Sequence, residues 1–423
     1  MKKYEAYKDS GIEWIGMIPE GWECLRMKHF AELVTTPSTS DNKIGLENIE
    51  SSTGRFIPTD SEFEGNGISF MPDDIVYGKL RPYLQKVWKA DMDGNAVGDF
   101  FVLRCNSKSY PTYLKYLLLS PNFTSVANGS TYGAKMPRVS SEFMMNFSWF
   151  LPSYSEQQAI ADYLDYKVGQ IDTSVADINT QIEDLKAYRQ AVISEAVTKG
   201  LNPDAPMKDS GIEWIGMIPE GWSIERIKFQ CNVTDGTHFS PQTTDEGKPY
   251  VTVANVNNNK IDVKGALLIS LADFETLVKQ GCQPAIGDVL LAKDGTVGRS
   301  AVVEDNNDFV CLSSLGILHP NDGLVSKFLK YSLDSSILQD QMSQAMAGSA
   351  LRRITIAKIK EFIFLLPAKD EQHAIADYLD KKTSKIDTAI KSLENQRDDL
   401  NTLRQTVISE AVTGKIDLRD WKK

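Results

Sequence analysis

Two stretches of the chain repeat apolar residues at alternating intervals of four and three positions. The first runs from Leu164 to Ala196 and the second from Leu379 to Ala411, and arginine enters the stripe at Arg189, Arg397 and Arg404. A period near 3.5 residues sustained over this length is typical of a coiled-coil seam. The pattern therefore predicts two long helices whose apolar stripes face another helix.

The two predicted helices are copies of one another. Residues 156–198 align with residues 371–413 without a gap, and 25 of the 43 positions are identical. A second repeat lies upstream, where KDSGIEWIGMIPEGW occurs unchanged at 8–22 and at 208–222. Repeats this far apart indicate a duplicated domain and not a solenoid. We expect the two helices to pair with each other in antiparallel fashion; the alternative is that each helix packs only on its own domain.

The segments between the repeats differ from each other and have another pattern. They contain short runs typical of β-strands, interrupted by Gly, Asn and Pro, and amphipathic stretches such as TYLKYLLLS at 112–120 and KFLKYSLDS at 327–335. Each segment is predicted to form a mixed α/β domain with a bent, mainly antiparallel sheet. A faint common frame remains, because Asn48 aligns with Asn255 and Lys79 with Lys293.

These features predict an α+β protein with a pseudo-two-fold internal duplication, in which two globular mixed α/β domains are joined by two long helices that form an antiparallel coiled coil. The predicted segments are the first variable domain with its shared peptide (1–152), the first helix (153–200), the linker with the second shared peptide and variable domain (201–367), and the second helix with a C-terminal tail (368–423). The tryptophans of the shared peptides are predicted to be buried against the domains and helices; they are Trp14, Trp22, Trp214 and Trp222.

Composition limits the class of protein. The chain has 423 residues, of which 42% are hydrophobic and 24% charged, as in an ordinary globular protein with sizeable cores. No apolar run approaches the ~18 residues of a membrane span, and the first residues lack the apolar core of a secretory signal. The five cysteines and four histidines are scattered, which argues against a zinc site or a disulfide framework. We expect a cytoplasmic protein.

The net charge of −11 hides two basic segments. Residues 79–138 carry nine basic and three acidic side chains and residues 326–360 carry six and two, whereas residues 156–198 carry three and eight. DNA phosphates require local positive charge, and Arg, Lys, Asn or Gln read base edges. The basic clusters therefore favour DNA binding, although each residue alone is equally consistent with a solvated surface charge. The candidate DNA-binding residues are Lys79, Arg81, Tyr83, Lys135, Arg138, His238, Lys293, Arg299, Arg352 and Arg353.

Catalytic motifs are missing from the sequence. It contains no GxxxxGK[ST] phosphate loop, no Gly-rich dinucleotide or S-adenosylmethionine fingerprint, and no amino-methyltransferase motif. PDDIVYGK at 72–79 is not followed by the acid-x-Lys of a nuclease site. We therefore expect no catalytic residue, no bound cofactor and no metal site in this chain.

Several of these motifs, in this order, resemble the specificity (S) subunit of Type I restriction-modification enzymes. They are GIEWIGMIPEGW before each variable domain, YGKLRPYLQKVW, DGTHFSP, and the helical LPxxxEQxAIADYLD, IDT and VISEAVT. The resemblance implies two target recognition domains, each reading one half of a bipartite, asymmetric double-stranded DNA target, separated by antiparallel helices.

The same resemblance implies assembly with two methylation (M) subunits and optionally two restriction (R) subunits. The complex would methylate adenine at N6 with S-adenosylmethionine, or cleave unmodified DNA with ATP and Mg²⁺. Two identical surfaces suit two copies of one partner, and the helices, with Gln157 and Gln372 near their starts, are the predicted docking site for the M subunits. The alternatives are a stand-alone two-headed DNA-binding regulator and a coiled-coil protein adaptor.

Overall fold

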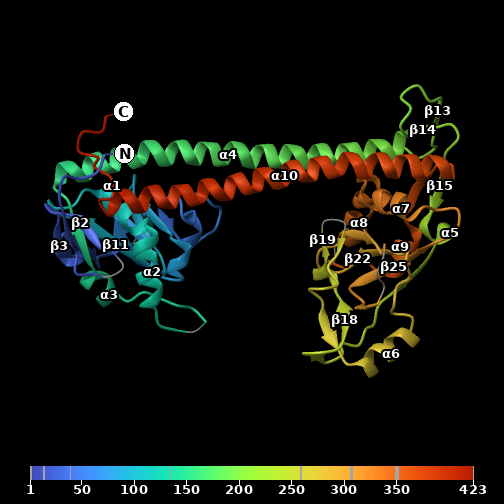
Figure 1. Ribbon diagram of the computed structural model, residues 1–423, viewed down its shortest axis with the longest axis horizontal. Helices are drawn as coiled ribbons and strands as arrows, with labels where there is room; N and C mark the ends of the chain where they lie inside the picture. The colour runs from blue at the N-terminus through green and yellow to red at the C-terminus, as the bar shows by residue number, and fades with distance from the viewer. Residues whose placement is uncertain are drawn as a thin grey trace. The chain divides into compact units, whose positions relative to one another are not determined.

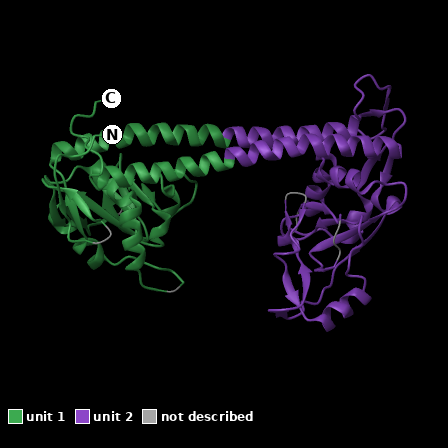
Figure 2. Ribbon diagram, viewed as in Figure 1, with its two compact units in different colours: residues 1–179, 394–423 green, residues 180–393 purple. Residues whose placement is uncertain are grey.

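The computed structural model of the protein describes residues 2–12, 15–38, 40–133, 135–257, 260–304, 308–347 and 352–422. The chain divides into two compact units, which we call unit 1 (residues 1–179 and 394–423) and unit 2 (residues 180–393) (Figure 2). The division falls within the two long helices, α4 (Tyr154–Lys199) and α10 (Lys369–Val412) (Figure 1). Each unit therefore combines one variable region with parts of both helices.

Unit 1 is built from short strands and three short helices. The strands are β1 (Tyr7–Asp9), β2 (Met17–Pro19), β3 (Glu23–Arg26), β4 (Ala31–Val34), β5 (Pro37–Ser38), β6 (Lys43–Ile44), β7 (Gly67–Phe70), β8 (Ile75–Gly78), β9 (Val87–Lys89), β10 (Gly94–Ala96), β11 (Phe100–Cys105) and β12 (Ser148–Leu151). The helices are α1 (Pro111–Leu119), α2 (Pro121–Gly129) and α3 (Ser141–Asn146).

Two four-stranded sheets form the body of unit 1. The first has the order β4-β11-β8-β9 with antiparallel neighbours throughout. Its inner strands read IVYG and FFVLRC, and such continuous apolar runs are typical of strands covered on both faces. The second sheet has the order β5-β7-β10-β6 and includes one parallel pair, β10 with β6. The shared peptide forms the separate hairpin β1-β2, and β3 pairs with β12.

Unit 2 has the same kinds of elements. Its strands are β13 (Met207–Asp209), β14 (Met217–Pro219), β15 (Ser223–Arg226), β16 (Cys231–Asp235), β17 (Thr243–Thr244), β18 (Lys248–Val251), β19 (Val256–Asn257), β20 (Lys260–Ile261), β21 (Leu267–Ile269), β22 (Val289–Ala292), β23 (Ser300–Val302), β24 (Val310–Cys311), β25 (Leu315–Pro320) and β26 (Ile363–Leu366). Its short helices are α5 (Ile227–Gln230), α6 (Leu271–Lys279), α7 (Ser326–Asp334), α8 (Ser336–Met346) and α9 (Ile356–Glu361). The larger sheets have the orders β16-β25-β22-β23 and β17-β21-β18-β24.

Both helices contribute to the main core of each unit. In unit 1, Leu164 of α4 and Ile408 of α10 are fully buried in one apolar cluster with Trp149. In unit 2, Ile193 of α4 and Leu379 of α10 are fully buried in the corresponding cluster. Each long helix therefore packs in the cores of both units, whereas the alternative raised from the sequence was that each helix packs only on its own domain.

The helices also contact each other within each unit, through the arginines that interrupt the apolar stripes. In unit 1, Arg404 Nε lies 3.0 Å from Asp172 Oδ1. In unit 2, Arg189 Nε lies 2.8 Å from Asp387 Oδ1. The two pairs occupy equivalent positions of the repeat, because 172 aligns with 387 and 189 with 404. Arg189 and Arg404 thus make ionic contacts between α4 and α10, whereas Arg397, the third interruption, pairs with Asp398 of its own helix.

The tryptophans of the shared peptides differ in burial. Trp22 and Trp222 are 2% and 3% exposed, as predicted, and their indole Nε1 atoms donate to Glu156 over 3.1 Å and to Glu371 over 3.0 Å. Trp214 is 53% exposed, so the prediction that it is buried is wrong. It lies in the turn between β13 and β14, beyond the paired strands. Trp14 lies outside the described residues.

The long helices α4 and α10 are rich in charged residues. Throughout the described part of the chain, no helix combines a membrane-spanning length with the apolar composition that a bilayer core requires.

Candidate nucleic-acid interface

In unit 1 the loop that follows β8 is held by backbone hydrogen bonds to a distant segment. Val139 N donates to Lys79 O over 3.0 Å, and Arg81 N donates to Pro137 O over 2.8 Å. These bonds bring the first and last residues of the basic segment 79–138 together. We call this contact the clasp of unit 1.

The rest of the loop is fixed from inside the domain. Arg81 and Gln85 have positive φ angles of 51° and 48°, a conformation that non-glycine residues adopt only when their surroundings impose it. The buried Gln85 side chain holds the backbone of this loop in place, because its Nε2 donates to Leu119 O over 3.2 Å and to Thr124 Oγ1 over 2.8 Å. Tyr83, between these two anchors, is left 53% exposed.

One acidic residue orients the basic side chains of this clasp. Arg138 donates from Nε and from a terminal nitrogen to both oxygens of Asp99, over 3.1 and 2.9 Å, and these hydrogen bonds raise the pKa of Arg138. Lys79 Nζ lies 3.8 Å from the same carboxylate. Arg81 and Lys135 are exposed. Two of these four basic groups contact the one acid and the other two are exposed, which leaves a net positive surface suited to phosphates.

Unit 2 repeats the clasp with other side chains. Ile354 N donates to Lys293 O over 2.8 Å, and Gly295 N donates to Arg352 O over 3.1 Å. The loop after β22 is thus closed by the same two backbone contacts as the loop after β8. At the position of Arg81 this loop has Gly295, which has a φ of 69° that glycine adopts without strain.

The lysines that begin the two loops, Lys79 and Lys293, differ in exposure. The Lys293 side chain is 3% exposed, and its Nζ lies 3.4 Å from Asp235 and 3.9 Å from Asp294. The prediction that Lys293 reaches DNA is therefore not supported by its placement, since a lysine enclosed by two carboxylates faces inward. Arg353, whose Nε lies 3.0 Å from Asp294, is 48% exposed and is the outward-facing member of this cluster.

The other predicted residues of unit 2 are exposed around the clasp. Arg352 is exposed, and Arg299 donates to Asn257 Oδ1 over 2.6 Å while remaining exposed. The His238 side chain is 67% exposed, with Nε2 3.3 Å from Asp235 Oδ2, the carboxylate that also faces Lys293. Asp235 therefore joins the loop that contains His238 to the clasp.

Several exposed aromatic and apolar residues beside the clasps were missed in the sequence. Tyr132 is 60% exposed and Met136 is 46% exposed, on either side of Lys135 in the chain, and Phe239 next to His238 is 67% exposed. Aromatic side chains among basic residues provide flat surfaces that can stack on bases. The signal that could have identified them is an aromatic residue within a Gly/Ser/Thr-rich segment beside a basic residue.

The two glutamines predicted to bind a partner are fully buried. Gln157 Nε2 donates to Lys108 O over 2.8 Å and to Pro152 O over 3.0 Å, and its Oε1 accepts from Tyr110 N over 2.8 Å. The equivalent partners of Gln372 are Gly323 O, Pro367 O and Val325 N. Direct contact of these amides with a partner is not supported, because their hydrogen bonds hold each helix start on its own domain.

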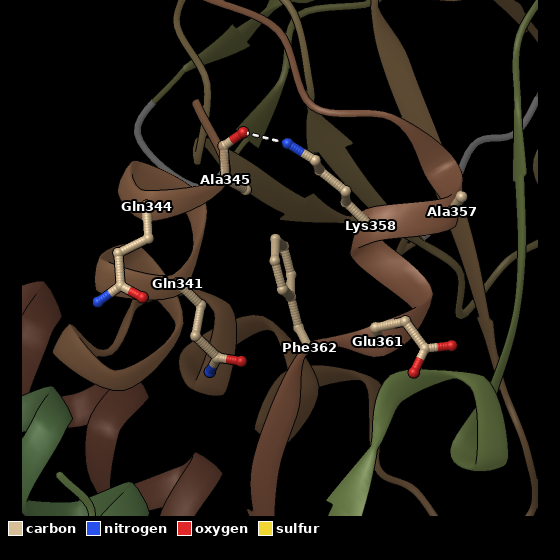
Figure 3. Close-up of a pocket in the computed structure, with 7 residues that line it drawn as sticks. All are labelled: Gln341, Gln344, Ala345, Ala357, Lys358, Glu361 and Phe362. Atoms are coloured by element: carbon tan, nitrogen blue, oxygen red, sulfur yellow. Dashed lines mark hydrogen bonds between the residues drawn. The ribbon is translucent and has the colours of Figure 1, made fainter. Parts of the chain in front are cut away.

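A hollow of about 520 Å³ lies in unit 2 between α8 and α9 (Figure 3). Its lining residues are Gln341, Gln344, Ala345, Ala357, Lys358, Glu361 and Phe362. Lys358 Nζ donates to Ala345 O across it, and Glu361 pairs with Arg226 and Lys228. Its charged groups therefore already have partners within the chain. Across the ranges that the structure describes, no group of three His, Cys, Asp or Glu side chains is arranged to hold a metal ion.

The chain is similar to one group of known proteins. Residues 219–396 match the model of the Type I restriction modification DNA specificity domain. The EcoBI specificity subunit of Escherichia coli is 25% identical over 311 residues, which are 71% of this chain and 65% of that protein, just under two thirds of its length. The MjaVIII specificity subunit of Methanocaldococcus jannaschii is 22% identical over 444 residues, 98% of each chain.

A solved structure has the same fold. A chain from a study of complex assembly and conformational transition of the type I R-M system aligns with 94% of this chain and 99% of its own length, with a TM-score of 0.70 and 19% identity. The mixed α/β content expected from the sequence is thus confirmed. The resemblance inferred from the sequence motifs is confirmed as well: residues 219–396 match the specificity-domain model, and the relatives are specificity subunits of Type I restriction enzymes.

Proposed function

We propose that the protein recognises double-stranded DNA by sequence as the specificity subunit of a Type I restriction-modification complex. The observation that carries this proposal is the repeated clasp. Two loops with the same backbone contacts present different side chains, Arg81 and Tyr83 in one unit and Arg352 and Arg353 in the other. A constant scaffold with variable basic and aromatic groups is what two different base-reading surfaces require.

The target of such a protein is bipartite and asymmetric, with each unit reading one half-site. We infer that α4 and α10 form an antiparallel coiled coil that separates the two recognition domains, because their equivalent pairs Asp172–Arg404 and Arg189–Asp387 cross between the helices in opposite order. The length of sequence between the half-sites would then depend on the helices and not on the domains.

Catalysis is assigned to partner subunits. We propose that the chain has no catalytic residue and docks two methylation subunits, and optionally restriction subunits, in the cytoplasm. The methylation subunits would transfer a methyl group from S-adenosylmethionine to adenine N6, and the restriction subunits would cleave unmodified DNA with ATP and Mg²⁺. The residues of this chain would bind and orient the DNA for these partners.

The test uses the complex of this chain with its methylation subunit and sequencing of methylated sites in cells. Lys79→Ala with Arg81→Ala should weaken recognition of one half-site, and Arg352→Ala with Arg353→Ala should weaken recognition of the other. Each lost base contact costs ~1–3 kcal/mol, and each lost phosphate contact lowers the salt slope of binding by about one. The matched control is Lys381→Ala with Lys385→Ala, an exposed basic pair on α10.

The outcome separates the rival functions. DNA binding of full specificity by the chain alone, with no need for a methylase partner, would favour a stand-alone regulator. If both clasp variants keep the DNA affinity and salt dependence of the wild type while the control variant loses them, the clasps do not face DNA.

A further inference from the structure

The shared peptide forms the same hairpin in both units. In unit 2 the register pairs Asp209 with Met217, and Ser210 N donates to Gly216 O over 3.0 Å. The turn is fixed by the hydrogen bond from Gly211 N to Asp209 Oδ1, over 2.9 Å, and by φ angles of 72° at both glycines. Unit 1 repeats these contacts. Local geometry therefore explains why the aspartate, the serine and the two glycines are identical in both copies.

Other identical positions of the hairpin have no such role within the chain. Trp214 and Met217 are each 53% exposed, and Met17 in the first copy is 48% exposed. Lys208 and Glu220 are exposed too, and among the residues with described placement nothing forms an ion pair or hydrogen bond with either side chain. Packing within the domain does not restrict an exposed side chain, so it does not explain why these residues are the same in both copies.

The identity ends near the two ends of the hairpin. Tyr7, the first residue of β1, is replaced by Met207, and directly after the shared peptide the exposed Glu23 is replaced by Ser223. In α4 and α10 the identities follow packing instead, because only five of the 25 identical positions are exposed in both copies. The hairpin is thus a short segment whose exposed side chains are identical as a group, whereas the exposed identities of the helices are scattered along them.

The chemistry of this face is that of a protein interface. Trp and Met are enriched at the centres of interfaces, and polar residues form the rim. Here Trp214 and Met217 would fill an apolar pocket of the partner, while Lys208 and Glu220 would pair with charges around it. Two identical faces in one chain suit two copies of one partner.

We propose that this hairpin face, in each of its two copies, is the docking surface for a methylation subunit. This inference rests on the proposed function, and it moves the docking site from the buried Gln157 and Gln372 to exposed residues that the sequence repeats. One methylation subunit binds at the hairpin of each unit.

The experiment counts methylation subunits in the co-expressed complex by native mass spectrometry. Met217→Glu should leave one subunit bound, Met17→Glu should also leave one, and the double variant should leave none. The matched control is Leu271→Glu, a residue that is 56% exposed in the divergent part of unit 2 and should retain both subunits. Lys8→Glu with Lys208→Glu provides a second, polar test that leaves the apolar side chains in place and should weaken subunit binding at least tenfold.

The possible results are distinguishable. If the wild-type chain binds no methylation subunit, the proposed function itself fails. If the wild type binds two and both double variants keep two at unchanged affinity, the docking site is wrong and the function stands; the identity of the peptides would then reflect sequence exchange between the copies. Loss of DNA affinity or of self-association in variants that still bind both subunits would likewise overturn the proposal.

Discussion

The two clasps have the same backbone and different surfaces. In unit 1, Lys79 and Arg138 share Asp99 and remain about a third exposed, whereas in unit 2 the equivalent Lys293 is enclosed by two carboxylates. The backbone contacts do not depend on side chains, so they can be kept while the reading residues change. The comparison teaches that alignment identifies equivalent positions but not equivalent roles.

The sheets of the two units are likewise the same in one part and different in another. The sheet β4-β11-β8-β9 has its counterpart in β16-β25-β22-β23, in the same order along the chain. In the second sheets, however, β7 pairs with β10, whereas β21 pairs with β18, the strand that directly follows β17. One face of each first sheet lies in the core that contains α4 and α10, while its opposite face packs with the second sheet in smaller cores. Structure is repeated where it packs on the repeated helices.

The largest expected difference between the units concerns the interhelical arginines. Arg404 is 3% exposed at its side chain and also donates to the carbonyls of Ser52 and Thr53, whereas Arg189 is 19% exposed. Arg404→Ala should cost about 3 kcal/mol, because it removes the partner of the partly buried Asp172 and of two carbonyls. Arg189→Ala should cost about 1 kcal/mol or less. Urea unfolding measures both, and equal costs would contradict the difference in burial.

The buried glutamines should behave alike in both units. Gln157→Leu and Gln372→Leu each leave one backbone N–H and two carbonyls without a partner where the helix meets its domain. A buried group that loses its partner costs about 1–3 kcal/mol, so we expect about 2–4 kcal/mol for each variant. Hydrogen exchange should increase at Tyr110 N in the first variant and at Val325 N in the second. A strong effect of one variant alone would show that the repeated contacts are not energetically equivalent.

The tryptophan–glutamate pairs should differ moderately. Glu156 accepts from Trp22 and from Tyr4 Oη over 2.6 Å, whereas the described residues bring only Trp222 to the carboxylate of Glu371. Hydrogen bonds to charged groups contribute about 1.5–3 kcal/mol. Trp222→Phe should therefore destabilise its unit by about 2 kcal/mol, and Trp22→Phe by less, in thermal unfolding. Tyr4→Phe combined with Trp22→Phe should remove the difference.

The smallest effect concerns acid stability in unit 1. Hydrogen bonds from Arg419 lower the pKa of Asp417 to about 2 from an ordinary 3.8. Because the folded pKa is below the unfolded one, this stabilisation is present above about pH 4 and is lost as the pH falls toward 2. Asp417→Asn should flatten the pH dependence of unfolding in that window. Asn202, which also lies just beyond the end of its long helix, does not titrate, so Asn202→Ala should leave the pH dependence unchanged.

The sequence determined the repeated framework of this protein. The 3.5-residue period predicted α4 and α10, the exact repeats predicted equivalent positions in two halves, and the charge distribution located the basic segments that form the clasps. These properties follow from the sequence because they depend on residues a few positions apart or on comparison of one half with the other. Two of the three arginines that interrupt the stripes, Arg189 and Arg404, have their acidic partners at equivalent positions of the repeat.

The tertiary structure alone decided which of these residues face outward. Asp235 in β16 encloses Lys293 from 58 positions away, and Gln157 is held by a carbonyl and an amide of Lys108 and Tyr110, 49 and 47 residues upstream. Trp214 is exposed because its turn extends beyond the paired strands. The exposure of a side chain is set by contacts between segments distant in the chain, and neither periodicity nor composition contains that information.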